Sequence, residues 1–312
     1  MKIRPVEKLT AILCALCLAV AVMSGSVFAR DEELPEETTP APEATFVVVD
    51  ASSEELSLES DEVIDNRGEI PFFVGEDLLC TCPLTEGVPY MSGETFFRAV
   101  GLGDAVNGDG QSLTVSAEGL TLQCSVGENI LVCNDRCLYA AQGILSADGE
   151  IYLPVELLVK CVGIGAAWDR SAWRITLYPE ETSYLEGGDS FYDETDVYWL
   201  SRLIYATAGD NALTAKIGIG NVVIHRTEDP TYEGQDTVYD VIFAKNQFDE
   251  VINGMIYMTP DEEAVLAAKV ALEGFDVTEG ATDFTTDTPE AGQIVSAVID
   301  GITFTTALEE QS

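Results

Sequence analysis

An internal repeat between residues 87 and 177 constrains the fold more than any other feature. The segment GVPYMSGETFFRAVGLGDAVNGDGQSLTV begins at Gly87 and GEIYLPVELLVKCVGIGAAWDRSAWRITL begins at Gly149, a constant offset of 62 residues. Identical residues align at this offset, among them Tyr90 and Tyr152, Glu94 and Glu156, Gly101 and Gly163, Gly103 and Gly165, and Thr114 and Thr176. Such a repeat is typical of a duplicated supersecondary unit that shares one core.

Each copy predicts the same elements in the same order: a strand, a short helix, a Gly-rich turn and a second strand. Apolar residues recur at helical spacing in both predicted helices: Phe96, Phe97 and Val100 in the first, and Leu157, Leu158 and Val162 in the second. Between the copies, polar and apolar residues alternate around glycines, as they do in antiparallel strands. The sequence therefore predicts that residues 71–180 form a small duplicated α+β module.

This module resembles the copper amine oxidase N-terminal-like domain of secreted bacterial wall proteins. The resemblance rests on the short helix, the following glycine, and the W-D or N-G pair before a strand in each copy. It implies a binding or spacer domain. The copper does not carry over, because copper sites use imidazole ligands and the only histidine, His225, lies outside the module. We expect no metal and no cofactor.

The cysteines of the chain are compatible with export. Two of the eight lie near the N-terminus, and the other six all fall within the module: Cys80, Cys82, Cys124, Cys133, Cys137 and Cys161. An even number in one secreted domain suggests disulfides, although six cysteines allow 15 connectivities. Free buried thiols are the alternative. A zinc site is a weaker one, because the C-x-C and C-x3-C spacings are not the usual zinc pairs.

Residues 1–29 have the order of a secretory signal. Basic residues come first, an apolar run extends from Leu9 to Met23, and Val27-Phe28-Ala29 offers a cleavage site. An uncleaved N-terminal anchor is the alternative. No later segment has the ~20 apolar residues of a spanning helix, so we expect a secreted, extracellular or wall-associated protein with no membrane span after cleavage.

The next segment, residues 30–70, is rich in Asp, Glu, Pro, Thr and Ser and predicts a disordered acidic tether. It contributes to a formal charge of −40, from 15 basic and 55 acidic residues. A surface of this sign repels phosphate backbones and anionic headgroups, so the composition excludes nucleic acid as a partner.

A second domain is predicted at residues 195–306, after an acidic, Gly-bearing linker at 181–194. Its first helix runs from Asp196 to Ala206, capped by Thr195 or Asp196, and a second begins after Asn211. The last helix is the best marked. Thr259 is in position to cap it, Pro260 and Glu262 complete the start signal, and Gly274 ends it.

This second domain resembles the spore cortex-lytic family of cell wall hydrolases. The resemblance is carried, in order, by RLIYATAGDN, IGIGNVVIHRTEDPTY, TVYDVIF, QF and TPDEEAVLAAKVALEGFD. It implies a lysozyme-like, mainly helical α+β fold that acts on the glycan strands of peptidoglycan, often as a lytic transglycosylase. The fold class expected for the whole chain is therefore α+β, a duplicated module followed by a hydrolase-type domain.

Glycosidic cleavage requires a carboxylic acid that protonates the leaving oxygen. The resemblance places this acid at the end of the first helix, in a Tyr-Ala-Glu-Ala pattern. Here the pattern is Tyr205-Ala206-Thr207-Ala208, and a threonine hydroxyl is not an acid near neutral pH. Asp210 and Asp283 are candidate replacements, and each can equally be a solvated carboxylate of a very acidic protein.

Other positions in the resemblance are candidates for substrate binding. These are Tyr205, His225, Arg226, Gln247 and Phe248. Tyr205 and Phe248 can serve as core residues or as sugar platforms. His225 can be a hydrogen-bonded helix-end residue, and Arg226 can pair with an internal carboxylate.

Two hypotheses of function follow, and the sequence leaves open whether the protein is an enzyme. In the favoured one, a catalytically impaired hydrolase domain, a pseudoenzyme, binds peptidoglycan glycan strands or another wall or spore protein. In the alternative, an active hydrolase uses a relocated carboxylate, Asp210 or Asp283.

Overall fold

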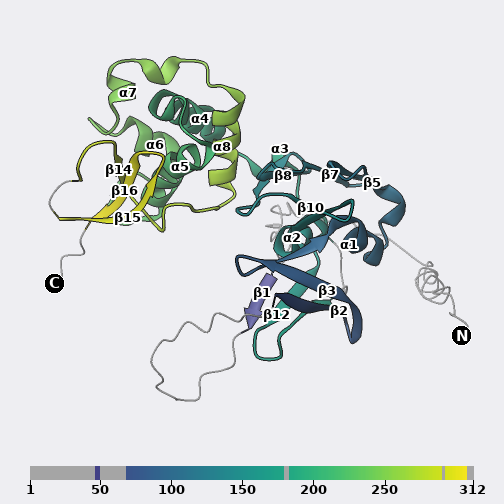
Figure 1. Ribbon diagram of the computed structural model, residues 1–312. Helices are drawn as coiled ribbons and strands as arrows, with labels where there is room; N and C mark the ends of the chain where they lie inside the picture. Colours follow the sequence, from purple (N-terminus) through teal and green to yellow (C-terminus); the bar gives the residue numbers. More distant parts are fainter. Residues whose placement is uncertain (1–45, 50–67, 179–182, 290–291, 308–312) are drawn as a thin grey trace, which may run out of the picture. The chain divides into compact units, whose positions relative to one another are not determined.

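The computed structural model describes residues 46–49, 68–178, 183–289 and 292–307. The predicted signal peptide lies outside these residues. The described residues all belong to one compact unit, and Figure 1 shows the arrangement of their strands and helices. No helix in the described part of the chain is both long and apolar enough to cross a membrane.

Eight strands form one sheet, in the order β1-β12-β13-β2-β3-β4-β11-β10. Their bounds are β1 Phe46–Val49, β2 Glu69–Val74, β3 Asp77–Thr85, β4 Val88–Ser92, β10 Leu145–Ala147, β11 Glu150–Pro154, β12 Gly165–Asp169 and β13 Arg174–Tyr178. Strand β1 falls within the predicted tether, where the run FVVV suits a strand, and it pairs with β12 in parallel.

The two copies of the repeat meet at the pair β4 and β11. Met91 lies opposite Leu153, its equivalent in the other copy, while Tyr90 lies opposite Pro154 and Ser92 opposite Tyr152. The antiparallel register is thus symmetric about Met91 and Leu153, as expected for an approximate two-fold axis between the copies. Helix α1 (Gly93–Ala99) follows β4, and α2 (Val155–Val162) follows β11, which confirms the predicted strand–helix order.

The residues between the copies form a second, five-stranded antiparallel sheet. It consists of β5 Val106–Gly108, β6 Ser112–Ala117, β7 Leu120–Ser125, β8 Ile130–Cys133 and β9 Arg136–Tyr139, in that order. Along β6 and β7 the side chains alternate between buried and exposed. The buried face joins Phe96 and Phe97 of α1 in the core of the module. The six cysteines of the module are free thiols, five of them buried.

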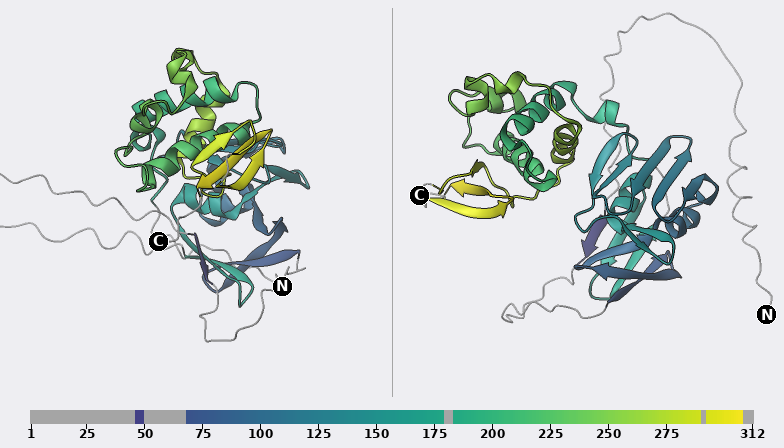
Figure 2. Two further views of the ribbon diagram at one scale, coloured as in Figure 1. Left: turned by 90° about the vertical axis from the view of Figure 1, so that its left-hand side faces the viewer. Right: turned by 45° about the horizontal axis from the view of Figure 1, so that its top comes forward.

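The C-terminal domain is mainly helical and carries one small sheet. Its longer helices are α4 Glu194–Ala208, α5 Leu213–Glu228, α6 Val238–Phe243 and α8 Glu262–Leu272, with short helices α3 Gly188–Phe191, α7 Asp249–Ile252 and η2 Met255–Tyr257. Strands β14 Asp283–Thr285, β16 Ile302–Ala307 and β15 Gln293–Ile299 form a three-stranded sheet in that order. Figure 2 shows this sheet beside the helices in both views.

Two predicted helix caps are wrong by two or three residues. The side chain of Asp193, rather than Thr195 or Asp196, caps α4 and accepts from the backbone N–H groups of both. Asp261, rather than Thr259, caps α8. In each helix, the Asp directly before the first helical residue has an extended backbone, and its side chain accepts from free N–H groups of the first turn. The end of α8 at Gly274, which has a φ of 82°, is as predicted.

A glycine lets α5 and α8 pack closely. A Cβ atom on Gly220 would lie 2.7 Å from the Cβ of Ala271 on α8, a distance that real Cβ atoms do not reach. The two helices and α4 enclose the core of the domain, which includes Leu200, Leu203 and Ile204 of α4. This packing fixes the inward face of α4, and with it the position of Thr207 at the helix end.

The described part of the predicted linker contacts both neighbouring regions. The backbone N–H of Leu185 donates to the carbonyl of Cys161, and that of Gly188 donates to the carbonyl of Asn134. The hydroxyl of Tyr192 accepts from the N–H of Cys137 at 3.0 Å and donates to Glu273 at 2.8 Å. Residues 183–192 are therefore held between the module and α8.

Candidate functional site

A cleft of about 360 Å³ opens at the C-terminal end of α4. Five of the residues singled out from the sequence line it together: Thr207, Arg226, Gln247, Phe248 and Asp283. They come from four separate parts of the chain, namely α4, α5, the segment between α6 and α7, and β14. Thr285, Thr286 and Ile302 complete the wall on the side of the small sheet.

Thr207 occupies the cleft position where the family resemblance places a glutamate. It lies on the last turn of α4, which buries Leu200 and Leu203 against the core. The Thr207 hydroxyl oxygen is buried and has no hydrogen-bond partner among the described residues. A hydroxyl at this place cannot protonate a leaving group near neutral pH, because its proton is far too weakly acidic.

Arg226 forms the buried floor of the cleft. Its Nε donates to the carbonyl of Thr282 at 2.6 Å, and its Nη2 donates to Oδ1 of Asp283 at 3.4 Å. The guanidinium lies 5.5 Å from the ring centre of Phe248 and 5.1 Å from that of Tyr232. Burial lowers the pKa of Arg226, while Tyr232 and Asp283 act in the opposite direction. An arginine remains charged under such a shift, so the floor of the cleft is cationic.

Asp283 is the one sequence-predicted carboxylate that reaches the cleft. Its Oδ1 accepts from Arg226 and, at 2.8 Å, from the backbone N–H of Phe284. Its Oδ2 accepts from the side-chain amide of Gln293 at 2.8 Å. Three donors thus hold an aspartate that is still partly exposed, with 44% of its side chain accessible. These three bonds orient the carboxylate and leave part of its acceptor capacity free.

Phe248 supplies an apolar wall. Its ring stacks on Phe284 with centroids 6.2 Å apart, and Phe284 in turn contacts Phe304 of β16 at 6.3 Å. Phe248 is buried apart from the side that lines the cleft. It therefore combines the two roles that the sequence left open, core residue and cleft wall.

Three of the predicted site residues lie elsewhere. Asp210 is an exposed turn residue after Gly209, which ends α4 with a φ of 52°. Tyr205 packs half-buried against the core of the domain. His225 is a structural residue, because its Nδ1 lies 2.7 Å from the carbonyl of Ala281 and its Nε2 lies 3.5 Å from Asp276. The described lining of the cleft includes none of the three.

Sequence reasoning missed two further carboxylates at the cleft. Asp249 and Glu250 both line it, from the first turn of α7. The available signal was their position directly after Gln247 and Phe248, which the family resemblance had already placed in the groove. Among the described residues, no group of three or more His, Cys, Asp or Glu side chains could hold a metal ion.

The C-terminal domain is similar in sequence to known proteins. The model of the Cell Wall Hydrolase family matches residues 210–304, a range that begins just after Thr207. The spore cortex-lytic enzyme of Halalkalibacterium halodurans is 36% identical over 106 residues, which cover 34% of this chain and 32% of that protein. That of Bacillus subtilis is 30% identical over 90 residues, or 29% of each chain. The chain thus spans about a third of the length of these relatives.

Two solved structures are similar to part of this chain. The catalytic domain of the Bacillus cereus SleB protein is 24% identical, with 37% of this chain and 92% of that chain covered and a TM-score of 0.34. The catalytic domain of the germination-specific lytic transglycosylase SleB from Bacillus anthracis is 25% identical, with a TM-score of 0.33. Residues 210–304 match the Cell Wall Hydrolase family model and are similar in sequence to spore cortex-lytic enzymes.

Proposed function

We propose that this is an exported cell-wall protein whose C-terminal domain binds peptidoglycan glycan strands in the cleft beside Thr207 and is impaired as a hydrolase. The observation that carries the proposal is Thr207 itself, a buried hydroxyl at the cleft position where glycosidic cleavage needs an acid. The signal at residues 1–29 would deliver the protein. The duplicated module would serve as a binding or spacer domain.

The rest of the cleft suits a sugar ligand. Gln247, Asp249 and Glu250 offer amide and carboxylate groups that can bond to sugar hydroxyls, and Phe248 offers an apolar wall. Pockets for small ligands typically combine an apolar lining with a few polar groups in this way. Binding can persist when the acid is lost, because proton transfer contributes to the rate rather than to recognition of the ground state. A wall or spore protein is an alternative occupant.

The test is release of reducing ends or anhydro-muropeptides from purified peptidoglycan and spore cortex. We expect the wild type to bind but to release little, and Thr207→Glu to release more. A general acid typically contributes about 10²–10⁴ in rate, and we expect the variant to gain no more than this. Robust release by the wild type would overturn the impaired assignment.

A second candidate function is an active hydrolase that uses Asp283, because this carboxylate lines the cleft. In that case Asp283→Asn would abolish release by the wild type. Asp210→Asn is a matched control, since the same change then falls on an exposed aspartate outside the cleft. Glu250→Gln examines the other side of the cleft. If the wild type is active and none of the three changes matters, the acid lies elsewhere.

A further inference from the structure

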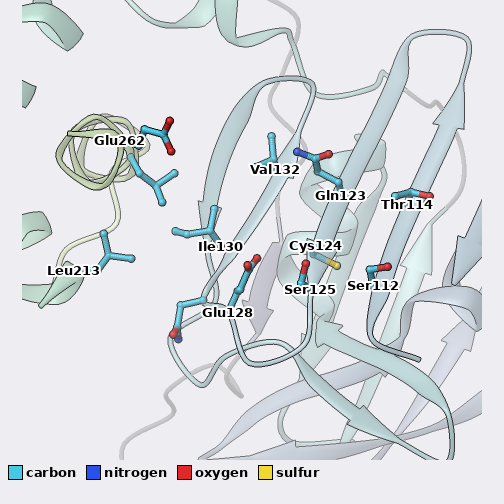
Figure 3. A pocket seen from close by; sticks show the side chains of 12 residues that line it. Ser112, Thr114, Gln123, Cys124, Ser125, Glu128, Ile130, Val132, Leu213 and Glu262 are labelled. Carbon is cyan, nitrogen blue, oxygen red and sulfur yellow. The ribbon is translucent and has the colours of Figure 1, made fainter. Parts of the chain in front are cut away.

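A second and larger hollow, of about 850 Å³, lies away from Thr207. One wall is the exposed face of β6, β7 and β8, and the other is formed by the starts of α5 and α8 (Figure 3). We call it the strand–helix groove. Its volume lies in the upper part of the usual range for ligand sites, about 300–1,000 Å³. The function proposed above does not use it.

The strand wall carries polar side chains that the fold does not engage. Ser112 and Thr114 bond to Asp109 and Asn107, and Asn129 donates to the carbonyl of Ala140. By contrast, the side chains of Gln123 and Ser125 have no hydrogen-bond partner among the described residues. Figure 3 shows both at the face of the strands that lines the groove. An amide and a hydroxyl are thus available to a ligand.

The charge of the groove selects against anions. Glu128 on the strand side and Glu262 on the helix side are its only charged lining residues in the described part of the chain. The whole chain adds a formal charge of −40. A ligand with phosphate or carboxylate groups would be repelled, whereas sugar hydroxyls can donate to both carboxylates.

Apolar side chains complete the lining. Ile130 and Val132 of β8 line the strand side, and Leu213 and Leu266 line the helix side. A pyranose ring has an apolar C–H face and a rim of hydroxyls, and an acetamido group adds a methyl beside an amide. We propose that the strand–helix groove binds an uncharged oligosaccharide of N-acetylated amino sugars. This site is separate from the cleft at Thr207 and does not require that cleft to bind glycan.

Two contacts join the strand side of the groove to the helix side. The Arg136 guanidinium of β9, next to β8 in the sheet, pairs with Glu273 at the end of α8, with Nη2–Oε2 at 2.7 Å. The rings of Tyr139 and Phe275 lie with centroids 4.6 Å apart. Binding to a preformed site avoids the cost of ordering its walls.

The test uses the full chain with labelled Ile, Leu and Val methyl groups, titrated with a hexamer of β-1,4-linked N-acetylglucosamine and followed by NMR. Methyl groups of Ile130, Val132, Leu213 and Leu266 report on the groove, and those of Ile302 report on the cleft. We expect the groove signals to shift with a saturable dependence on ligand. Binding at the cleft alone, which shifts only Ile302, would overturn the groove proposal and leave the proposed function standing.

The double variant Gln123→Ala, Ser125→Ala removes the two free polar groups. We expect it to raise the groove Kd about ten-fold, as two lost hydrogen bonds would, while shifts at Ile302 stay unchanged. Gln111→Ala is the control, because Gln111 is exposed and is not among the lining residues. An unchanged groove Kd would overturn the assignment. The assignment would also be overturned if trilysine, a cationic peptide, shifted the groove signals and the hexamer did not.

Discussion

Arg136 and Glu273 form a two-point ion pair, with the Nε–Oε1 and Nη2–Oε2 distances both 2.7 Å. Both side chains are buried, at 4% and 3% exposure. Lys160 Nζ adds a contact at 3.0 Å to Oε2, and the Tyr192 hydroxyl donates to Oε1 at 2.8 Å. Glu273 caps the C-terminus of α8, where the helix dipole disfavours a carboxylate. Its four donors offset this cost and tie the module to the C-terminal domain.

Glu273→Gln should lower the free energy of unfolding by about 3–5 kcal/mol, because it removes the negative charge of a buried ion pair. The measurement is urea unfolding at neutral pH. Glu118→Gln makes the same chemical change on an exposed turn and should cost less than about 0.5 kcal/mol. Equal losses in the two variants would mean that the pair contributes no stability.

The same pair predicts how stability depends on pH. Burial acts to raise the pKa of Glu273, but hydrogen bonds from Arg136, the charges of Lys160 and Arg136, and the Tyr192 hydroxyl outweigh it and lower the pKa below 4.5. A lowered folded-state pKa stabilises the protein above the unfolded value, and this contribution is lost as the pH falls through the folded value. Stability should therefore decline below about pH 4.5.

Glu273→Gln should flatten this decline, measured by urea unfolding in steps between about pH 7 and pH 3. Some slope should remain, because the pKa of Asp276 is also lowered, with burial opposing and Thr278 and Gly280 favouring its ionised form. An identical slope in wild type and variant would remove Glu273 from the acid response.

Local patterns could predict much of the architecture. The repeat predicted two strand–helix units, and the structure joins them at Met91 and Leu153. The resemblance predicted a site residue at position 207, at the end of the first helix, and Thr207 lines the cleft. These features depend on neighbours a few residues apart, so a periodic sequence encodes them.

Contacts between residues that are far apart in the sequence could not be predicted from local patterns. Arg136 and Glu273 are 137 residues apart in the sequence, and nothing near either residue indicates the other. The same holds for the strand–helix groove. Asp249 and Glu250 reach the cleft because the fold brings α7 to the end of α4, whereas Asp210, close to Thr207 in sequence, lies on an exposed turn outside the cleft lining.

Gly220→Ala should destabilise the C-terminal domain. The added methyl would meet the Cβ of Ala271 at 2.7 Å, and overpacking of this kind costs about 1–3 kcal/mol. Alanine is more favourable than glycine in a helix by up to about 1 kcal/mol. We therefore expect a net decrease in the free energy of unfolding. Thermal unfolding followed by circular dichroism measures it. An unchanged or raised Tm would show that α5 and α8 can move apart freely.

Export is predicted to end with cleavage after Ala29, which leaves a mature chain that begins at Arg30. N-terminal sequencing of the protein recovered from the medium or the wall checks this. A recovered chain that still begins with Met1 would favour the uncleaved anchor.

Thr207→Val separates the structural role of the hydroxyl from any chemical one. The Thr207 oxygen is buried without a partner among the described residues, and such an oxygen costs about 1–3 kcal/mol. Valine has the same shape and nearly the same helix propensity. Replacing the hydroxyl by a methyl should therefore raise the free energy of unfolding by about 1 kcal/mol, measured by urea unfolding.

Thr207→Ser is the matched variant, because it keeps the hydroxyl and removes the methyl. It should destabilise the protein, since a buried methyl group contributes about 1 kcal/mol. The opposite order, with valine less stable than serine, would mean that the hydroxyl has a partner, such as a bound water in the cleft. The Thr207 hydroxyl would then be able to hydrogen-bond to a ligand. Threonine in place of the acid would supply a hydrogen-bonding group to the cleft rather than an unsatisfied hydroxyl.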